Sequence, residues 1–217
     1  MAEREIHDHW FREAKRKGYR SRAAFKLMQI DDRRGVLKKG DQVLDLGCAP
    51  GSWLQVIAAR VGKKGRAWGI DLQDVAKGLP ENVTALLGNA ENPDGAGVPA
   101  GLLFDVILSD MMPSTTGSRD TDHFRSVRVC ELAMDLCPQW LKPNGTLVMK
   151  VLEGSAMPQL LAEAGVRFDK VKPFKPEASR KESTEIFIIA HGYRGPPQGE
   201  PDEVAAATGP PAVPEGW

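Results

Sequence analysis

The amino-acid sequence predicts an α/β fold of the doubly wound type, in which helices cover both faces of a mostly parallel β-sheet. Two observations lead to this prediction. Short apolar runs alternate with segments of helical periodicity along most of the 217 residues, and this order is typical of α/β domains. The apolar runs are also continuous, as expected of strands that are buried on both faces of a parallel sheet.

The first half of the chain supplies three of the predicted strands and one helix. The segments QVLDL at residues 42–46 and RAWGIDL at residues 66–72 are strands, and VTALLG at residues 83–88 is a weaker one. Between the first two, WLQVIAARV at residues 53–61 places its apolar side chains at helical spacing. This order predicts a parallel strand–helix–strand unit.

The second half of the chain continues the alternation. Helical periodicity is expected at residues 127–141 and again at residues 157–165, where Gly165 ends the helix. The strands are predicted at residues 104–110, 145–152, 166–174 and 185–192. Ligands of doubly wound folds bind beyond the carboxyl ends of the strands, so the residues that follow the strands are the candidates for function.

Composition indicates a globular protein of one domain. The chain is 41% hydrophobic and 27% charged, and it contains no apolar stretch of the roughly 18–20 residues that a membrane span needs. The N-terminus lacks the apolar segment of a secretory signal. We therefore expect a cytoplasmic protein without a membrane anchor. Cys48, Cys130 and Cys137 follow no metal-ligand spacing and are predicted to be reduced and buried, and no metal site is expected.

Charge is distributed unevenly, although the formal net charge is zero. Residues 1–40 contain twelve Lys/Arg against six Asp/Glu, whereas residues 195–217 contain four acids, no base and ten Pro or Gly residues. We expect a basic arm at residues 1–20, a folded domain at residues 21–194 and a disordered acidic tail at residues 195–217. The basic arm is interpreted either as a surface for a polyanion or as a solvated helix face.

The segment DLGCAPGSW, from Asp45 to Trp53, is a glycine-rich turn between a strand and a helix. It does not match the dinucleotide fingerprint G-x-G-x-x-G, and Pro50 removes one N–H that a pyrophosphate would use. Asp71 ends the next strand, where a carboxylate can accept hydrogen bonds from both hydroxyls of a ribose. A cofactor with a ribose but no phosphate fits both observations, as S-adenosylmethionine does. The other interpretation is a tight turn and a helix cap.

Four further residues stand in order in distinctive segments: Lys26 in SRAAFKL, Asp110 in ILSDMMPSTTG, Lys150 in GTLVMKVLEG and Glu185 in SRKESTEIFIIA. Together with DLGCAPGSW, they make the chain resemble the FtsJ/RrmJ family of RNA ribose 2′-O-methyltransferases from about residue 18 to residue 192. The resemblance implies a Rossmann-like methyltransferase domain at residues 21–194. Its sheet would have seven mostly parallel strands, with the last strand antiparallel, and its cofactor would be S-adenosylmethionine.

The resemblance also implies roles for individual residues. Lys26, Asp110, Lys150 and Glu185 match the catalytic tetrad of the family, with Lys150 as the proton acceptor. The cofactor-binding positions are Gly51, Trp53, Asp71, Asn89 and Asp110. Asn89 stands where the bacterial enzyme has aspartate; its amide can still contact an adenine edge, although asparagine is also common in turns.

The chemistry of methyl transfer leaves two roles open for the lysine. The reaction is an in-line displacement from a sulfonium, so alignment contributes most, roughly 7–11 kcal/mol in well-oriented systems. An ordinary lysine has a pKa of ~10.4, and only about one in 2,500 is neutral at pH 7. Lys150 is therefore either a proton acceptor with a lowered pKa or a group that orients the hydroxyl while the proton leaves late.

Two basic segments are predicted to bind RNA. The arm offers Arg4, Arg12, Lys15, Arg16, Lys17, Arg20 and Arg22, with Trp10, Phe11 and Tyr19 either stacking on nucleotides or packing on the core. The second segment offers Lys170, Lys172, Lys175, Arg180 and Lys181. The resemblance implies methylation of a uridine ribose of large-subunit ribosomal RNA on the assembled subunit. We also expect the protein to be a monomer.

Several other functions compete with this one. The same chemistry on transfer RNA, a messenger cap or another RNA is the main alternative, and a non-catalytic ribosome-assembly factor is the alternative from another class. A methyltransferase of proteins or small molecules is disfavoured by the basic arm. A nicotinamide-dependent dehydrogenase is disfavoured by the missing third glycine and by Pro50.

Overall fold

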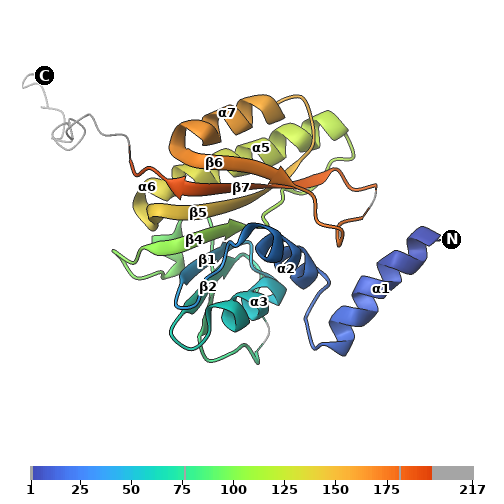
Figure 1. The fold of residues 1–217 in the computed structure, drawn as a ribbon, viewed down its shortest axis with the longest axis horizontal. Helices are drawn as coiled ribbons and strands as arrows, with labels where there is room; N and C mark the ends of the chain where they lie inside the picture. Colours follow the sequence, from blue (N-terminus) through green and yellow to red (C-terminus); the bar gives the residue numbers. More distant parts are fainter. Residues whose placement is uncertain (1, 76, 181, 197–217) are drawn as a thin grey trace, which may run out of the picture.

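The computed structural model describes residues 2–75, 77–180 and 182–196, and its centre is a seven-stranded sheet (Figure 1). The strands are β1 (Gln42–Leu46), β2 (Arg66–Asp71), β3 (Val83–Leu87), β4 (Phe104–Ser109), β5 (Leu141–Leu152), β6 (Phe168–Phe174) and β7 (Glu185–Tyr193). They lie in the order β3-β2-β1-β4-β5-β7-β6. The pairs from β3 to β5 are parallel, and β7 runs antiparallel to both β5 and β6. The predicted fold class is confirmed.

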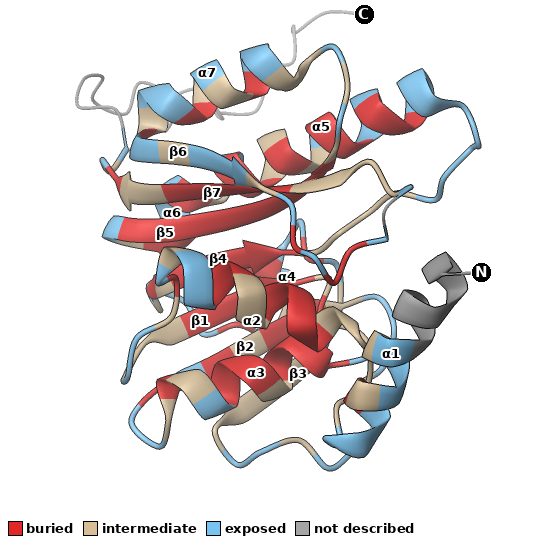
Figure 2. Cartoon of the chain, turned by 45° about the vertical axis from the view of Figure 1, so that its right-hand side comes forward, coloured by how far each residue is buried: buried red, intermediate tan, exposed pale blue. Residues whose placement is uncertain are grey.

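Helices cover both faces of this sheet (Figure 1). They are α1 (Ala2–Arg16), α2 (Ala23–Arg34), α3 (Ser52–Val61), α4 (Pro93–Ala96), α5 (Arg119–Asp135), α6 (Cys137–Trp140) and α7 (Met157–Arg167). α2 and α3 pack on one face, and α5, α6 and α7 pack on the other. In Figure 2 most of α3 is buried, whereas buried and exposed residues alternate along α5. None of the helices in the described ranges has the length and hydropathy of a membrane-crossing segment.

Alternation along β5 decides which side chains face the site. Met149 and Val151 point into the core under α5, whereas Val148 points into the core under α2 and α3. Because side chains alternate along a strand, Lys150 lies on the α2/α3 face with Val148. Lys150 is paired with Phe187 in the antiparallel register, and Leu152 is paired with Glu185. Lys150 and Glu185 are thus diagonal neighbours on one face.

The helix predictions need two corrections. The helix expected at residues 127–141 is two helices, α5 and α6, and α5 begins eight residues earlier, at Arg119. Its first two turns are polar and show no apolar periodicity. Pro138, in the first turn of α6, has no N–H with which to continue the hydrogen bonding of α5. The second helix does not end at Gly165 but continues to Arg167, where Phe168 donates its N–H to the carbonyl of Ala164.

Other elements lie where the pattern placed them, within a few residues. β1 matches its predicted bounds, and β5 begins at Leu141, four residues before its predicted start. The pattern did not delimit α1, α2 or α4. All three cysteines are buried free thiols, as predicted. The tail from residue 197 onward lies outside the described residues, so its predicted disorder stays a prediction.

Candidate active site

The glycine turn joins β1 to α3 and lies against the segment that follows β4. Gly47 has a φ of 79°, and a Cβ there would come within 2.8–3.2 Å of Met111 side-chain and backbone atoms. Gly51 has a φ of 98°, and a Cβ there would lie 2.9 Å from a methyl group of Val75. Both positions therefore need glycine, because other residues rarely adopt this backbone conformation and would also clash.

Hydrogen bonds from Arg20, which precedes α2, fix the position of this turn. Its guanidinium donates to the carbonyl of Pro50 at 2.9 Å and to the carbonyl of Lys77 at 2.7 Å, so it ties the glycine turn to the β2–β3 connection. Its backbone N–H donates to Oε1 of Gln55 on α3. Arg20 was predicted to contact RNA phosphates, but these contacts give it a structural role inside the protein.

Asp71 ends β2 beside the turn, as predicted. Its Oδ2 accepts the N–H of Ala49 at 2.8 Å, and its Oδ1 accepts the N–H of Gln73 at 2.8 Å. Each carboxylate oxygen has a further lone pair, so the side chain is held in place and can still accept from ribose hydroxyls. Asn89 is exposed after β3, and its Oδ1 accepts the N–H of Glu91. That contact is an Asx turn, and it leaves the amide nitrogen and a second lone pair of Oδ1 of Asn89 for a ligand.

Trp53 lies in the first turn of α3, and its side chain is used within the fold. It is 3% exposed, and its indole N–H donates to the carbonyl of Ala23 at 2.8 Å. Its ring packs on Phe187, with ring centroids 5.7 Å apart. The tryptophan thereby joins α2 to β7, and its contact with the cofactor stays a prediction.

Lys150 and Asp110 form the first half of the predicted tetrad. The Lys150 ammonium donates to the backbone carbonyl of Asp110 at 2.6 Å and lies 2.8 Å from its carboxylate Oδ1. Oδ1 accepts no hydrogen bond in the described structure, so that contact is an ion pair with an unfavourable hydrogen-bond angle. Lys150 is 7% exposed. A buried ammonium needs such partners, because desolvation of an unpaired charge is costly.

Lys26 and Glu185 form the second half. Lys26 comes from α2 and Glu185 from the start of β7, and their charged atoms lie 2.8 Å apart. Lys26 also lies 6.0 Å from the centroid of the Phe187 ring, beside the strand that carries Lys150. The four residues, which are distant in sequence, therefore lie together on the α2/α3 face at the carboxyl end of the sheet.

The charges of the two halves influence each other. Burial raises the pKa of Glu185, but the charge and hydrogen bond of Lys26, followed by the charge of Lys150, outweigh burial and hold that pKa below its ordinary value. Glu185 is consequently an anion at neutral pH. Two lysines and two carboxylates balance one another in the site.

This lowered pKa predicts a pH-dependent contribution to stability. Glu185 stabilises the fold fully above the ordinary pKa of 4.5, and this contribution is lost as the pH falls through the lowered value. We expect Glu185→Gln to reduce the free energy of unfolding by about 1.5–3 kcal/mol at pH 7 and by progressively less in acid. Urea unfolding at several pH values checks this, with the exposed Glu153→Gln as control. A difference that does not change with pH would contradict it.

Two residues that the sequence analysis did not single out organise the segment after Asp110. The carboxylate of Asp122 accepts the N–H and hydroxyl of Thr116 and the N–H of Gly117. His123 is 2% exposed, and its ring contacts the carbonyl of Leu152 and the N–H of Ala156. Both lie in the polar first turns of α5, where charge alone did not distinguish them from solvated residues.

The acidic side chains suit a positively charged ligand with a ribose. Asp45, Asp71 and Asp110 end or follow neighbouring strands, and the turn offers no N–H at Pro50. Neither oxygen of Asp45 nor Oδ1 of Asp110 has a hydrogen-bond partner in the described structure. These carboxyl groups fit S-adenosylmethionine, whose sulfonium is cationic. In the described ranges, no group of three or more His, Cys, Asp or Glu side chains is placed to hold a metal ion.

Comparison with known sequences gives consistent matches over almost the whole folded region. The profile of FtsJ-like methyltransferases matches residues 19–193. A ribosomal RNA large subunit methyltransferase E from Syntrophobacter fumaroxidans is 43% identical over 192 residues, covering 87% of this chain and 97% of the relative. The protein of the same name from Methanothermobacter thermautotrophicus is 40% identical and covers 87% of this chain and 90% of the relative.

Solved structures give the same picture of the fold. A candidate ribosomal RNA methyltransferase from Plasmodium falciparum superposes with a TM-score of 0.71 at 28% identity, covering 82% of this chain and 100% of that structure. Fibrillarin from Aeropyrum pernix, solved with natively bound S-adenosylmethionine, superposes with a TM-score of 0.51 at 16% identity over 77% of this chain and 73% of its own. At that identity the likeness concerns the fold alone.

Proposed function

The chain belongs to the FtsJ-like methyltransferase family, and from this premise we propose that it transfers a methyl group from S-adenosylmethionine to a ribose 2′-hydroxyl of large-subunit ribosomal RNA. The observation that carries the proposal is the convergence of two ion pairs, Lys26–Glu185 and Lys150–Asp110, beside the glycine turn. Relatives named ribosomal RNA large subunit methyltransferase E, about 40% identical, support the substrate.

Lys150 is the group that we place on the reacting hydroxyl. S-adenosylmethionine supplies an activated methyl group on a cationic sulfur, so the protein has to align the hydroxyl and accept one proton. An ammonium has three N–H donors, and in the described structure only the Asp110 carbonyl takes a hydrogen bond from Lys150. A remaining N–H can donate to the hydroxyl oxygen and direct its free lone pair.

The contacts of the Lys150 ammonium with the carbonyl and carboxylate of Asp110 support the orienting role over the strong-base role. As the new C–O bond forms, the hydroxyl oxygen becomes positive and its proton becomes strongly acidic. The proton then leaves without a strong base. Oδ1 of Asp110, 2.8 Å from the Lys150 ammonium, is a nearby acceptor. Lys26 and Glu185 are positioning residues, which keep the local charge balanced.

The RNA surface that we propose is smaller than the sequence predicted. Arg16, the last residue of α1, and Lys17 just after it form ion pairs with Glu13. The side chain of Arg4 lies outside the described ones. Trp10 and Tyr19 pack on Phe25, with ring centroids 4.9 and 6.0 Å away. Phe11, by contrast, is 60% exposed. Of the three aromatic residues of the arm, Phe11 is therefore the one available for stacking on a nucleotide.

Arg22 is the best-placed cation for the RNA backbone. It precedes α2 and is half-buried, and its guanidinium has no hydrogen bond or ion pair within the described part of the chain. Burial and the nearby charge of Arg180 lower its pKa, while Glu185 acts in the opposite direction. Two like charges beside the tetrad suit a phosphate next to the target ribose.

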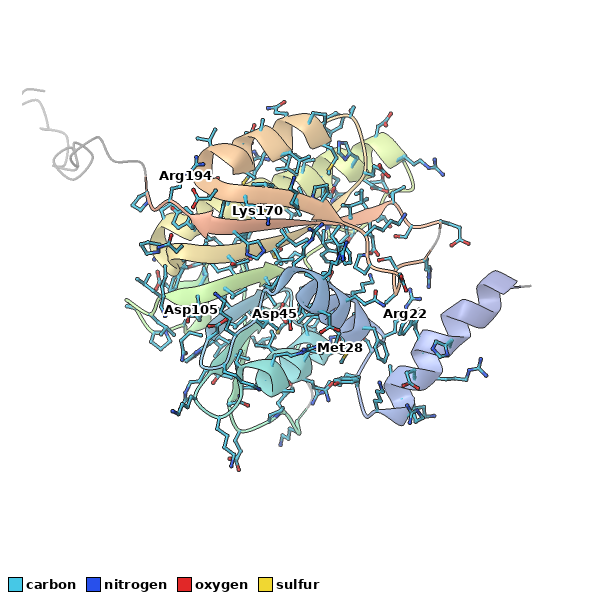
Figure 3. The ribbon with its side chains drawn as sticks, viewed as in Figure 1. Arg22, Met28, Asp45, Asp105, Lys170 and Arg194 are labelled. Carbon is cyan, nitrogen blue, oxygen red and sulfur yellow. The ribbon has the colours of Figure 1, made fainter. Side chains whose placement is uncertain are left out.

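The second predicted basic segment, residues 170–181, does not form one continuous surface. Lys170 lies on the outer strand β6, well away from Arg22 (Figure 3), and Lys172 lies on the same strand. Lys175 donates to the carbonyl of Ser183, and Lys181 lies outside the described residues. We therefore assign Arg22 and Arg180 to the target nucleotide, and Lys170 and Lys172 to more distant parts of the RNA.

Replacing Arg22 by glutamine should weaken RNA binding about three- to tenfold and lower the slope of log K against log salt by about 1, because one phosphate contact is lost. Filter binding at several salt concentrations measures both quantities. The control is Arg66→Gln, which removes an exposed arginine at the start of β2, at the other end of the sheet. Equal effects of the two variants would contradict the assignment.

The proposed function is tested by incubating the protein with methyl-labelled S-adenosylmethionine and three substrates: large-subunit particles, free large-subunit RNA and transfer RNA. We expect label in large-subunit RNA, most strongly on assembled particles. Label in transfer RNA alone would replace the substrate, and no label in any RNA would favour a non-catalytic binding factor. We further infer a monomer, since the large exposed apolar side chains are scattered over separate elements of the described chain. The names of the relatives, which are enzymes of ribosomal RNA, support a cytoplasmic location.

A further inference from the structure

Asp45 is a buried acidic residue that has no role in the proposed mechanism. It lies on β1, one residue before the end of that strand, and has an exposed fraction of 0%. Neither of its carboxyl oxygens has a hydrogen-bond partner in the described structure. Val43 belongs to the core under α2 and α3, and Asp45 (labelled in Figure 3) points to the same face because side chains alternate along a strand. An unpartnered carboxyl group in such a place is costly unless it serves a purpose.

Within the described ranges, the groups around Asp45 include other acids but no cation that forms an ion pair with it. Its register partners are Gly69 on β2 and Leu108 on β4, neither of which is polar. The thiol of Cys48 lies above Gly69, and Asp71 and Asp110 stand at the ends of the two neighbouring strands. The two lysines of the site form ion pairs with other residues, Lys150 with Asp110 and Lys26 with Glu185.

This environment keeps Asp45 uncharged in the free protein. A fully buried carboxylate without a partner loses its hydration and gains nothing in return, so the group holds its proton instead. Burial, followed by the negative charges of Asp110 and Asp71, raises the pKa of Asp45 well above its ordinary value. A positive charge placed beyond the glycine turn would act in the opposite direction and favour ionisation.

We propose that Asp45 releases its proton to solvent when the cationic cofactor binds and takes a proton back once the methyl group has left, so that the site distinguishes sulfonium from thioether. This inference rests on the proposed function. The residues that carry it are Asp45, fully buried and without a partner, and the flanking pair Asp71 and Asp110. Asp45 is thus a positioning residue that acts through charge, and it does not touch the reacting atoms.

The proton balance is simple. On binding of a cation, the Asp45 carboxyl group becomes a carboxylate, and one proton goes to solvent. Methyl transfer converts the sulfonium to a neutral thioether and releases the hydroxyl proton, and Asp45 recovers one proton from solvent. Affinity for the cation therefore rises with pH, whereas affinity for the neutral product does not. Product release is favoured because the acid is again neutral.

Titration calorimetry in two buffers with different ionisation enthalpies tests this with the full chain. At pH 7 we expect up to one proton to be released per S-adenosylmethionine bound, and none per S-adenosylhomocysteine. We also expect the affinity for S-adenosylmethionine to rise by up to tenfold per pH unit. In Asp45→Asn, which resembles the protonated acid, proton release should disappear and S-adenosylmethionine should bind at least about tenfold more weakly. The binding of S-adenosylhomocysteine should stay unchanged.

The matched control is Asp41→Asn. Burial raises the pKa of Asp41 as well, but Asp41 precedes β1, at the opposite end of the strand, and should not respond to the cofactor. Equal proton release in wild type and Asp45→Asn, or none in wild type, would overturn the inference. If Asp45→Asn does not fold, the comparison of the two ligands in the wild type still decides. Absence of binding by both ligands would overturn the proposed function too, whereas binding without proton release overturns only this inference.

Discussion

Lys150→Ala is expected to slow methyl transfer to RNA by about 10²–10⁴-fold, the range that removal of a positioned acid–base group produces. The reason is geometric, because the ammonium that orients the 2′-hydroxyl is held by both the carbonyl and the carboxylate of Asp110. Affinity for RNA should change far less, since one lysine contributes only one of many contacts. Single-turnover transfer of labelled methyl groups, measured beside RNA binding, separates the two effects.

A second lysine on the same strand provides a matched control. Lys142 also lies on β5, and its ammonium lies 2.8 Å from the carboxylate of Asp105, at the opposite end of the sheet. Figure 3 shows Asp105 on the side away from Arg22. Lys142→Ala should therefore transfer methyl groups at the wild-type rate. If Lys150→Ala were as active as Lys142→Ala, the assignment of Lys150 to the reaction would be wrong.

Gly47→Ala is expected to produce the second large effect, a loss of cofactor binding of tenfold or more together with a less stable fold. Alanine at a φ of 79° is strained by about 1–2 kcal/mol. Its Cβ would also push Met111 away from the glycine turn, and Met111 directly follows Asp110. The change therefore disturbs the cofactor site and the partner of Lys150 together. Calorimetry with S-adenosylmethionine and urea unfolding measure the two effects.

The control for this glycine is Gly40→Ala. Gly40 has a comparable φ of 92°, but a Cβ there would meet nothing within 4 Å. It shares the backbone strain of Gly47 without the displacement of a neighbour, and it precedes β1, far from the carboxyl ends of the strands. Gly40→Ala should lower stability alone. Equal loss of cofactor affinity in the two variants would show that strain, rather than contact with Met111, is responsible.

Strands such as β1 and β4 could be predicted from the sequence because they are continuous apolar runs. The tetrad positions were predicted from the resemblance to the FtsJ/RrmJ family, because no local pattern marks a helix residue such as Lys26 as part of a site. Helices with polar first turns were harder. α5 begins with Arg119 and Asp120, whose charges hide the periodicity that marks its later turns. α2 was not delimited for a related reason, since Lys26 is buried by its ion pair with Glu185 rather than by its own character.

The supporting residues of the site could not be found from sequence patterns, because their roles depend on partners that are distant in the chain. In the sequence Arg20 is indistinguishable from the other arginines of the basic arm. In the structure it donates a hydrogen bond to the carbonyl of Pro50, which is 30 residues away in the chain. Trp10 and Tyr19 could stack on RNA or pack on Phe25, and only tertiary structure decides between the two. Asp45 is the first residue of the glycine motif, but nothing in the motif indicates that it is unpartnered.

The central claim is that this protein methylates the 2′-oxygen of a ribose in large-subunit RNA, and alkaline hydrolysis of RNA labelled by the protein tests it most directly. A 2′-O-methyl group removes the hydroxyl that cleaves the adjacent phosphodiester in alkali. We predict that the labelled methyl groups remain in alkali-resistant dinucleotides after wild-type protein has acted, and that Lys150→Ala leaves almost none. Label recovered in mononucleotides would place the methyl group on a base and would contradict the account.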